Sequence, residues 1–246
     1  MTQTTAAPNQ ITVTTESASA QQAAADAGGN AKGKRRGAKP VVAKQLGGAI
    51  RQRNEERILR AAAEVFASAG YKGTSVQAIA DKVELPKANI LYYFKSKAGL
   101  YTAVLNDILE MWNQGFDERA IEREPADVIR EYILAKMRYS RTRPQESKIF
   151  ATEIIHGAPV IRDAIDLPMV GWTKQKASVI QAWVAQGKMR AIEPLYLLFL
   201  IWGTTQFYAD FDSEIAMIKG RALSDEEFSK AEDFVVETVL RGLALI

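Results

Sequence analysis

The chain has 246 residues, a formal net charge of +3, no cysteine and one histidine. The lack of cysteine excludes a disulfide scaffold, a thiol nucleophile and Cys-based metal sites, and a single histidine excludes a multi-histidine metal site. Apolar residues make up 47% and charged residues 25%, an ordinary balance for a soluble globular protein with a sizeable core. We therefore expect no metal and no cofactor.

The charge is unevenly distributed along the chain. Residues 1–101 hold 15 basic and 7 acidic residues, whereas residues 102–246 hold 17 basic and 22 acidic residues. This split indicates a polyanionic partner for the first part, with a solvated basic tail as the alternative. The first twenty residues do not resemble a secretory signal, and the longest apolar stretch is far below the ~20 residues that cross a bilayer. We expect a cytoplasmic protein without membrane contact.

Residues 1–47 are rich in Ala, Thr, Gln and Gly and show little periodicity, which predicts a disordered basic arm. The arm either touches DNA phosphates or has no role of its own. Its basic residues form one cluster, which comprises Lys32, Lys34, Arg35, Arg36, Lys39 and Lys44.

Four helices are predicted after the arm, and each has a start or stop signal. Apolar residues recur with helical spacing over residues 50–69, and Gly70 ends this helix. The next three begin at a capping box (Thr74 to Gln77), a proline and a serine cap. They are predicted to span about 74–83, 86–93 and 96–117.

The remaining chain continues as helices separated by prolines and glycines. The later helices are predicted to begin at Pro125, Pro144, Glu193 and Ser224, and Pro168 to start or kink another, with Gly157 to Pro159 as a break. The last three run to Gly187, to about Met217 and to Gly242. The sequence thus predicts an all-α protein of about nine helices, with a small bundle over residues 48–101 and a larger one over 102–246.

A long helix, two short helices around a tight turn, and another long helix make up a helix-turn-helix. The second short helix would lie in the major groove, where Lys and Asn side chains bind phosphates or base edges and Ala allows close approach. The hydroxyls of Tyr92 and Tyr93 can donate to phosphates, although these two tyrosines could instead be half-buried packing residues. The predicted DNA contacts are Thr74, Lys87, Ala88, Asn89, Tyr92, Tyr93 and Lys97.

Residues 58–105 resemble the DNA-binding domain of the TetR family. The matching elements are Phe66 to Gly70, Gly73-Thr74 to Ile79-Ala80, and Tyr92 to Phe94 followed by Ser96-Lys97 and Leu100. The resemblance implies a ligand-responsive transcriptional regulator, most often a repressor, that binds a double-stranded DNA operator as a homodimer. Three residues depart from the family pattern: Glu84 replaces a usual Gly, Pro86 a Ser or Thr cap, and Gly99 a helix-favouring residue.

The resemblance also implies that the last two helices, about 193–217 and 224–244, form the dimer interface. Packing within the chain is the alternative for the apolar surface of the final helix. That surface comprises Phe228, Phe234, Val235, Val239, Leu240, Leu243 and Leu245.

All four tryptophans lie in the C-terminal part, and Trp202 and Gln206 share one helix face. An indole beside a carboxamide suits a planar heterocycle with a lactam edge, although a core Trp beside a satisfied Gln is the commoner arrangement. The resemblance extends to a uracil-sensing member of the family, whose effector-binding residues match Trp112, Trp202 and Gln206. His156, next to a Gly-Ala-Pro segment, either lines the same pocket or is an ordinary surface or core histidine.

We therefore expect a regulator controlled by a small pyrimidine such as uracil. The alternative effectors are a hydantoin, a dihydropyrimidine or an unrelated aromatic compound. An enzyme with an accessory DNA-binding domain is disfavoured, because the C-terminal part has no nucleophile elbow, phosphate loop or metal-ligand spacing. A non-specific DNA binder that depends on the arm is the third possibility.

Overall fold

The structure is a computed structural model that describes residues 41–160 and 162–246. All elements in these ranges are helices, as predicted, and from Val42 onward they form one compact unit. They are α1 (Val41–Gly73), α2 (Val76–Lys82), α3 (Lys87–Phe94), α4 (Lys97–Asn113), the 3₁₀ helix η1 (Glu118–Glu122), α5 (Pro125–Thr142), α6 (Pro144–Ile155), α7 (Arg162–Ala185), α8 (Pro194–Asp210), α9 (Asp212–Lys219) and α10 (Asp225–Gly242).

The first helix begins earlier than predicted. Residues 41–47, which the sequence assigned to the disordered arm, belong to α1. The two glycines at 47 and 48 suggested a break, but glycine costs a helix only about 1 kcal/mol per residue and does not by itself end one. The rest of the predicted arm lies outside the described residues.

Helices α1 to α4 enclose a core of apolar side chains, among them Ile58, Phe66, Ile79, Ile90 and Leu100. The helical path of α1 is broken at Gly70, whose φ of 68° is accessible to glycine at little cost. The N-cap of α2 is Ser75 rather than Thr74, because the Ser75 hydroxyl accepts the Ala78 N–H. Ser96 caps α4 as predicted.

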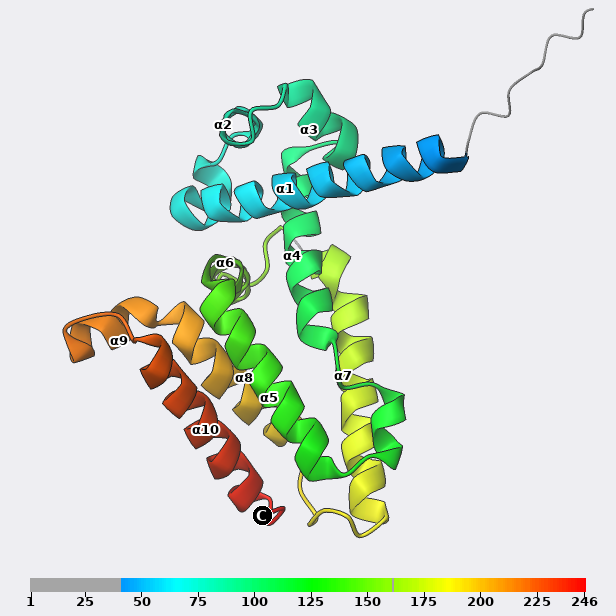
Figure 1. Ribbon diagram of the computed structural model, residues 1–246, viewed down its shortest axis with the longest axis vertical. Helices are drawn as coiled ribbons and strands as arrows, with labels where there is room; N and C mark the ends of the chain where they lie inside the picture. The colour runs from blue at the N-terminus through cyan, green and yellow to red at the C-terminus, as the bar shows by residue number, and fades with distance from the viewer. Residues whose placement is uncertain (1–40, 161) are drawn as a thin grey trace, which may run out of the picture. The chain divides into compact units, whose positions relative to one another are not determined.

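Helix α4 leads from the helix-turn-helix into the C-terminal bundle, where it packs against α6 and α7 (Figure 1). It ends at Asn113, before the predicted end near Asp117, because Gly115 turns the chain with a φ of 80°. Phe116 is then buried against Trp183 and Tyr132. The short η1 that follows was not predicted.

The C-terminal bundle is centred on α5, which packs along α8 on one side and α10 on another (Figure 1). Ser224 and Glu227 form the capping box predicted for α10. The predicted helix from Glu193 to Met217 is instead two helices, α8 and α9, because the backbone leaves helical geometry at Phe211. Among the described residues, no helix is both long and apolar enough to span a lipid bilayer.

Candidate functional site

The predicted recognition helix is α3, and it presents three of the predicted contact residues to solvent. Lys87, Ala88 and Asn89 lie exposed in its first turn, while Ile90 and Phe94 face the core. Pro86 precedes this turn and has no side-chain hydroxyl, so no side-chain cap occupies the first N–H groups of α3. The geometry allows this turn to approach a DNA groove.

The two tyrosines of α3 differ in exposure. Tyr92 is 64% exposed, and Tyr93 is half-buried beside it with the rings edge to face at 5.6 Å. The guanidinium of Arg51 on α1 lies 6.0 Å from the Tyr92 ring and 5.8 Å from the Tyr93 ring. Arg51 therefore extends the basic surface of α3, a role that sequence patterns did not single out because it depends on how α1 packs.

Two predicted contact residues have structural roles in the free protein. Thr74 is only 3% exposed, and its hydroxyl donates to the carbonyl oxygens of Gly70 and Val65. The Lys97 ammonium donates to the carbonyls of Tyr71 (2.9 Å) and Thr74 (3.0 Å) and lies over the Tyr71 ring. Both residues hold the turn after α1 in place, and their contacts with DNA stay predictions.

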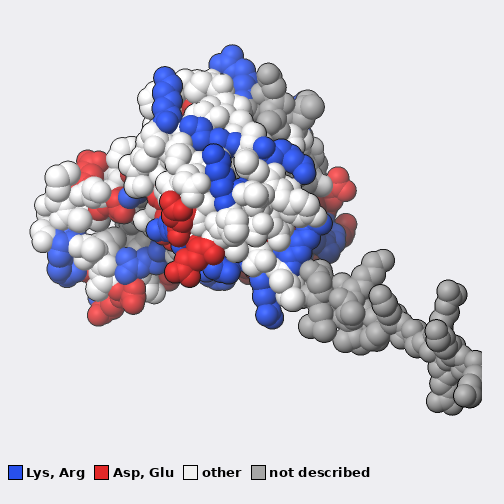
Figure 2. All heavy atoms as spheres, turned by 90° about the horizontal axis from the view of Figure 1, so that it is seen from above, with Lys and Arg blue, Asp and Glu red and all other residues white. Residues whose placement is uncertain are grey.

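Figure 2 looks onto α1 to α3 from above, and Lys and Arg side chains stand out over this face. In the described part of the chain up to the end of α3, the exposed basic residues are Arg51, Arg53, Arg57, Arg60, Lys72, Lys82, Lys87 and, directly after α3, Lys95. Some are engaged: Lys82 pairs with Glu64, and Arg57 donates to the Val83 carbonyl. The surface supplies the positive charge that binding to a phosphate backbone requires.

The departures from the family pattern have distinct outcomes. Glu84 lies in the left-handed region with a φ of 54°, so the turn carries the strain expected of a non-glycine residue there. Gly99, in contrast, is not a weak point. Its N–H donates to the Ser96 cap, and a Cβ at this position would collide with the Phe94 carbonyl oxygen.

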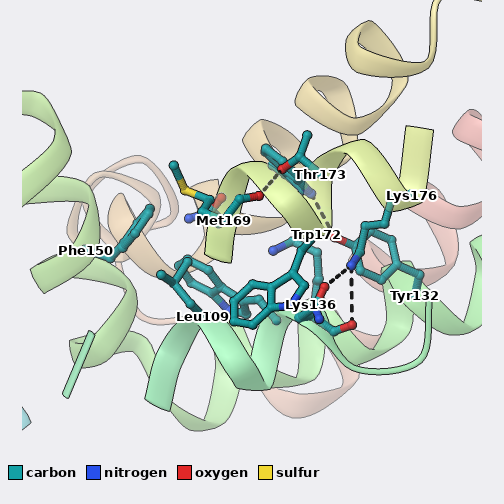
Figure 3. A pocket seen from close by; sticks show the side chains of 12 residues that line it. Leu109, Tyr132, Lys136, Phe150, Met169, Trp172, Thr173 and Lys176 are labelled. Carbon is teal, nitrogen blue, oxygen red and sulfur yellow. Dashed lines mark hydrogen bonds between the residues drawn. The ribbon is translucent and has the colours of Figure 1, made fainter. Parts of the chain in front are cut away.

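A small cavity of about 80 Å³ lies among α4, α5, α6, α7 and α8. Figure 3 shows the side chains that converge on it from these helices. Its wall is mainly aromatic, with Trp112, Trp172 and Trp202 joined by Phe150 and Tyr132. The volume is far below the ~300–1,000 Å³ of sites for drug-sized ligands, so the cavity suits a single small ring.

The three effector-binding residues predicted from the sequence all line this cavity. Trp112 comes from α4, and Trp202 and Gln206 come from α8. The Trp202 Nε1–H donates to the Tyr132 hydroxyl at 2.8 Å, which fixes the indole and leaves the Tyr132 O–H as a donor. Gln206 makes no hydrogen bond with any described residue, so its carboxamide is available to a ligand.

Two buried lysines also line the cavity, Lys136 on α5 and Lys176 on α7. Burial, with a smaller contribution from the nearby charge of Lys176, lowers the pKa of Lys136 to about 7. Burial likewise lowers the pKa of Lys176 to about 8. The Lys176 ammonium donates to the backbone and side-chain oxygens of Asn113 (Figure 3).

The sequence contains a signal for both lysines, although neither belongs to a recognised motif. Lys136 follows Tyr132 and Ile133 by one helical turn, and Lys176 precedes Val179 and Ile180 by one turn, so each lies on an apolar helix face. A lysine in such a position points into the bundle. Trp172 also lines the cavity, and the sequence analysis missed it because the resemblance implied only Trp112, Trp202 and Gln206.

His156 does not line the cavity. It is exposed at the C-terminal end of α6, and its Nδ1 lies 2.7 Å from the Thr152 carbonyl oxygen. It is thus an ordinary surface histidine. Within the described residues, no group of three His, Cys, Asp or Glu side chains could hold a metal ion.

Helix α6 joins the cavity to the helix-turn-helix. At one point Phe150 packs edge to face on Trp112, with ring centroids 5.2 Å apart. One turn later, the buried Glu153 carboxylate accepts hydrogen bonds from the Tyr101 hydroxyl at 3.0 Å and the Val160 N–H at 2.7 Å. Tyr101 in turn packs on Phe66 of α1. Direct contacts thus connect Trp112 to α1 by way of α6 and Tyr101.

Comparison with known protein families agrees with this division of the chain. Residues 58–104 match the model of bacterial regulatory proteins of the tetR family, and residues 105–246 match the model of the C-terminal region of YcdC-like proteins. The chain belongs to the TetR family. It is a TetR-family transcriptional regulator with a DNA-binding helix-turn-helix.

Two relatives of this TetR-family chain are informative. It is 36% identical to the HTH-type transcriptional regulator RutR of Escherichia coli K12 over 77% of this chain and 90% of RutR. It is 27% identical to the HTH-type transcriptional repressor NicS of Pseudomonas putida over 78% of this chain and 92% of NicS. The relatives are thus transcriptional regulators, and nothing among them supports catalysis.

Solved structures support the TetR fold at lower identity. PfmR, a TetR-family regulator of Thermus thermophilus, has a TM-score of 0.57 and 21% identity over 75% of this chain and 97% of its own. HlyIIR, a hemolysin II transcriptional regulator, has a TM-score of 0.55 and 24% identity over 78% of this chain and 98% of its own.

Proposed function

We propose that this regulator is a homodimeric repressor that binds its operator through α3 and releases it when a small pyrimidine such as uracil binds the cavity. The observation that carries the proposal is the composition of the cavity wall, in which Trp112, Trp202 and Gln206 surround about 80 Å³ of space. The same three residues are those that the sequence predicts by resemblance to a uracil sensor. The likeness to RutR over 77% of the chain supports the same effector class.

Recognition of a pyrimidine would use stacking and one polar edge. Indole faces stack on a planar ring, and a carboxamide offers an acceptor and donors that match a C=O beside an N–H. Gln206, whose carboxamide is not engaged by a described residue, would bind this lactam edge. The apolar remainder of the wall would exclude water from the contact.

Release of DNA would follow from the position of Trp112 on α4. Trp112 lies 15 residues after Lys97 on one helix, a span of about 22 Å at 1.5 Å per residue. A ligand that favours a shifted α4 would favour a dimer in which the recognition helices no longer match successive major grooves. The coupling free energy in such systems is typically ~1–3 kcal/mol.

The dimer interface would be built on α8 and α10, with a different surface from the one predicted. Most of the apolar face of α10, including Phe228, Val235 and Leu240, packs within the chain. Phe234 remains exposed on α10. On α8 the exposed large apolar residues are Leu195, Tyr196, Phe199, Leu200 and Phe207. A surface of this kind is typical of a protein interface.

Calorimetric titration of the purified protein tests the effector class. We expect heat of binding with uracil that saturates below millimolar concentration. The absence of heat at millimolar uracil would contradict the pyrimidine proposal. Parallel titrations with hydantoin and dihydrouracil test the alternative effectors, and tighter binding of either would replace uracil with that class.

A further inference from the structure

Lys136 is an unusual residue for the wall of an aromatic cavity. It is only 3% exposed, and its neighbours along α5, Ile133 and Met137, are fully buried. A buried ammonium without a counter-charge is strongly disfavoured, which is why such groups are usually paired. A binding role would explain why this position holds a lysine.

The Lys136 ammonium has no hydrogen-bond partner among the described residues. Lys136 is one of the residues whose side chains line the cavity. It lies 4.5 Å from the centroid of the Trp112 ring, which stabilises a cation but accepts no strong hydrogen bond. The acceptor for this ammonium is therefore left for a ligand to supply.

Two lysines and two more distant carboxylates set the charge around the cavity. Lys176 on α7 lines the same cavity as Lys136, and among the described residues no carboxylate lines it. Asp210 on α8 acts on Lys136 from outside the wall, but its carboxylate already accepts from Ser147 at 2.6 Å. Asp117 acts on Lys176 in the same way, and its carboxylate accepts from Arg119. Within the described wall the two ammonium groups therefore face no anion, which favours a ligand that carries negative charge on an acceptor oxygen.

The hydrogen-bonding groups of the wall agree with this. Tyr132 has a free O–H donor because its oxygen accepts from Trp202, and Asn113 uses its side-chain oxygen on Lys176. The described wall thus offers a ligand more hydrogen-bond donors than acceptors, and its principal acceptor is the Gln206 carboxamide oxygen. An oxygen-rich ring with few N–H groups fits this set better than a ring rich in donors.

We infer that the effector binds as an acidic heterocycle whose exocyclic oxygen, next to a deprotonated ring nitrogen, carries negative charge, and that Lys136 is the specificity-determining residue that contacts this oxygen. On binding, the acidic ring N–H loses its proton, which goes to the Lys136 amine when that amine is neutral and to solvent when it is already charged. The resulting contact is an ammonium-to-oxyanion hydrogen bond, the stronger charge-assisted kind. The inference rests on the proposed function and narrows its ligand class.

Uracil and 5-fluorouracil are the probes, because fluorine is scarcely larger than hydrogen yet makes the ring N–H markedly more acidic. We expect wild-type protein to bind 5-fluorouracil about tenfold more tightly than uracil at neutral pH, as a charge-assisted hydrogen bond requires. In Lys136→Met this preference falls to nearly equal affinity, and Lys136→Gln, which keeps a donor without the charge, also loses it. Lys174→Met, an exposed lysine on α7, is the matched control and keeps the wild-type preference.

The ¹⁹F NMR signal of 5-fluorouracil gives a second readout. The bound ligand should titrate at a lower pH than the free ligand in wild-type protein, and should not in Lys136→Met. If both probes bind but the preference is the same in wild type and Lys136→Met, the inference is overturned while the proposed function stands. If neither probe binds wild-type protein, the proposed pyrimidine effector fails, and the inference fails with it.

Discussion

At the scale of single residues, the cavity contains polar groups where a helical bundle ordinarily places aliphatic side chains. Lys136, Lys176 and Gln206 all lie among buried and partly buried aromatic residues. Burial of such groups without full pairing costs free energy of folding. The polar groups of the cavity therefore lower the stability of the free protein, and in the proposed function the ligand supplies their missing partners.

Gln206→Ala should weaken the response to uracil and leave operator binding intact. Removal of a hydrogen-bonding partner from a buried contact costs about 1–3 kcal/mol, which is roughly 5- to 150-fold in affinity. Uracil binding is measured by calorimetry and operator binding by fluorescence anisotropy. Gln181→Ala, an exposed glutamine on α7, is the control. An unchanged uracil response would remove Gln206 from the site.

Lys136 should also make stability depend on pH in a specific direction. Its pKa is lowered by burial from about 10.5 to about 7, so between these values the unfolded chain binds more protons than the folded one. The contribution of Lys136 to stability therefore rises as pH increases from about 7 towards 10.5.

Urea unfolding of wild type and Lys136→Met at pH 7 and pH 9 measures this effect. We expect Lys136→Met to be more stable than wild type at pH 7 by about 1–3 kcal/mol, because a buried charge is replaced by an apolar side chain of similar length. The advantage should shrink at pH 9. If the difference in unfolding free energy between the two proteins were the same at both pH values, the Lys136 ammonium would not be desolvated.

At the scale of elements, α4 and α6 connect the cavity to the helix-turn-helix. The hydrogen bond from Tyr101 to Glu153 joins the two helices in a buried environment, and Phe150 on α6 touches Trp112 on α4. Contacts of this kind carry coupling when they have two discrete arrangements. In the proposed function, a second set of contacts, through α6, would thus link Trp112 to the DNA-binding helices.

Tyr101→Phe should destabilise the protein by about 1–3 kcal/mol, because one oxygen of the buried Glu153 carboxylate loses its partner. Operator binding should persist, while release by uracil weakens. Tyr71→Phe is the control, since the Tyr71 hydroxyl makes no hydrogen bond with any described residue although its ring packs beside Tyr101. Anisotropy titrations with and without uracil would detect the change, and equal release by both variants would count against the link.

Much of this element scale was predictable from the sequence, and the failures have physical reasons. Strong local signals, such as the Ser96 cap and the Ser224 capping box, gave correct helix starts. Gly115, which ends α4, is a local signal that the sequence prediction did not use, whereas no side-chain cap marks the break at Phe211. The motif shows where Thr74 and Lys97 lie but not which carbonyls they reach, so their structural roles could not be predicted, and their DNA contacts stay predictions.

At the scale of the whole molecule, the account requires two copies of the chain, each with its exposed α8 and α10 surface buried. Phe234→Glu should weaken or abolish the dimer, because a carboxylate would enter an apolar interface. Analytical ultracentrifugation measures the outcome. Ile155→Glu, an equally exposed apolar residue on α6, is the control and should leave the dimer unchanged. A stable Phe234→Glu dimer would move the interface away from this part of α10.

The charge asymmetry of the chain has a matching functional division. The exposed basic residues of α1 to α3 form the proposed DNA surface, and the acidic C-terminal part holds the cavity and the proposed dimer surface. The two functions are therefore separable by mutation. Changes to the cavity should alter the response without altering the affinity of the free protein for DNA.

The most direct test of the central claim is the effect of uracil on the complex with a fluorescently tagged operator, followed by anisotropy. The account predicts that uracil releases the operator from wild-type protein in a saturable manner, and that release from the Gln206→Ala complex needs roughly 5- to 150-fold more uracil. If millimolar uracil left operator binding by the wild-type protein unchanged, the proposed function would be contradicted.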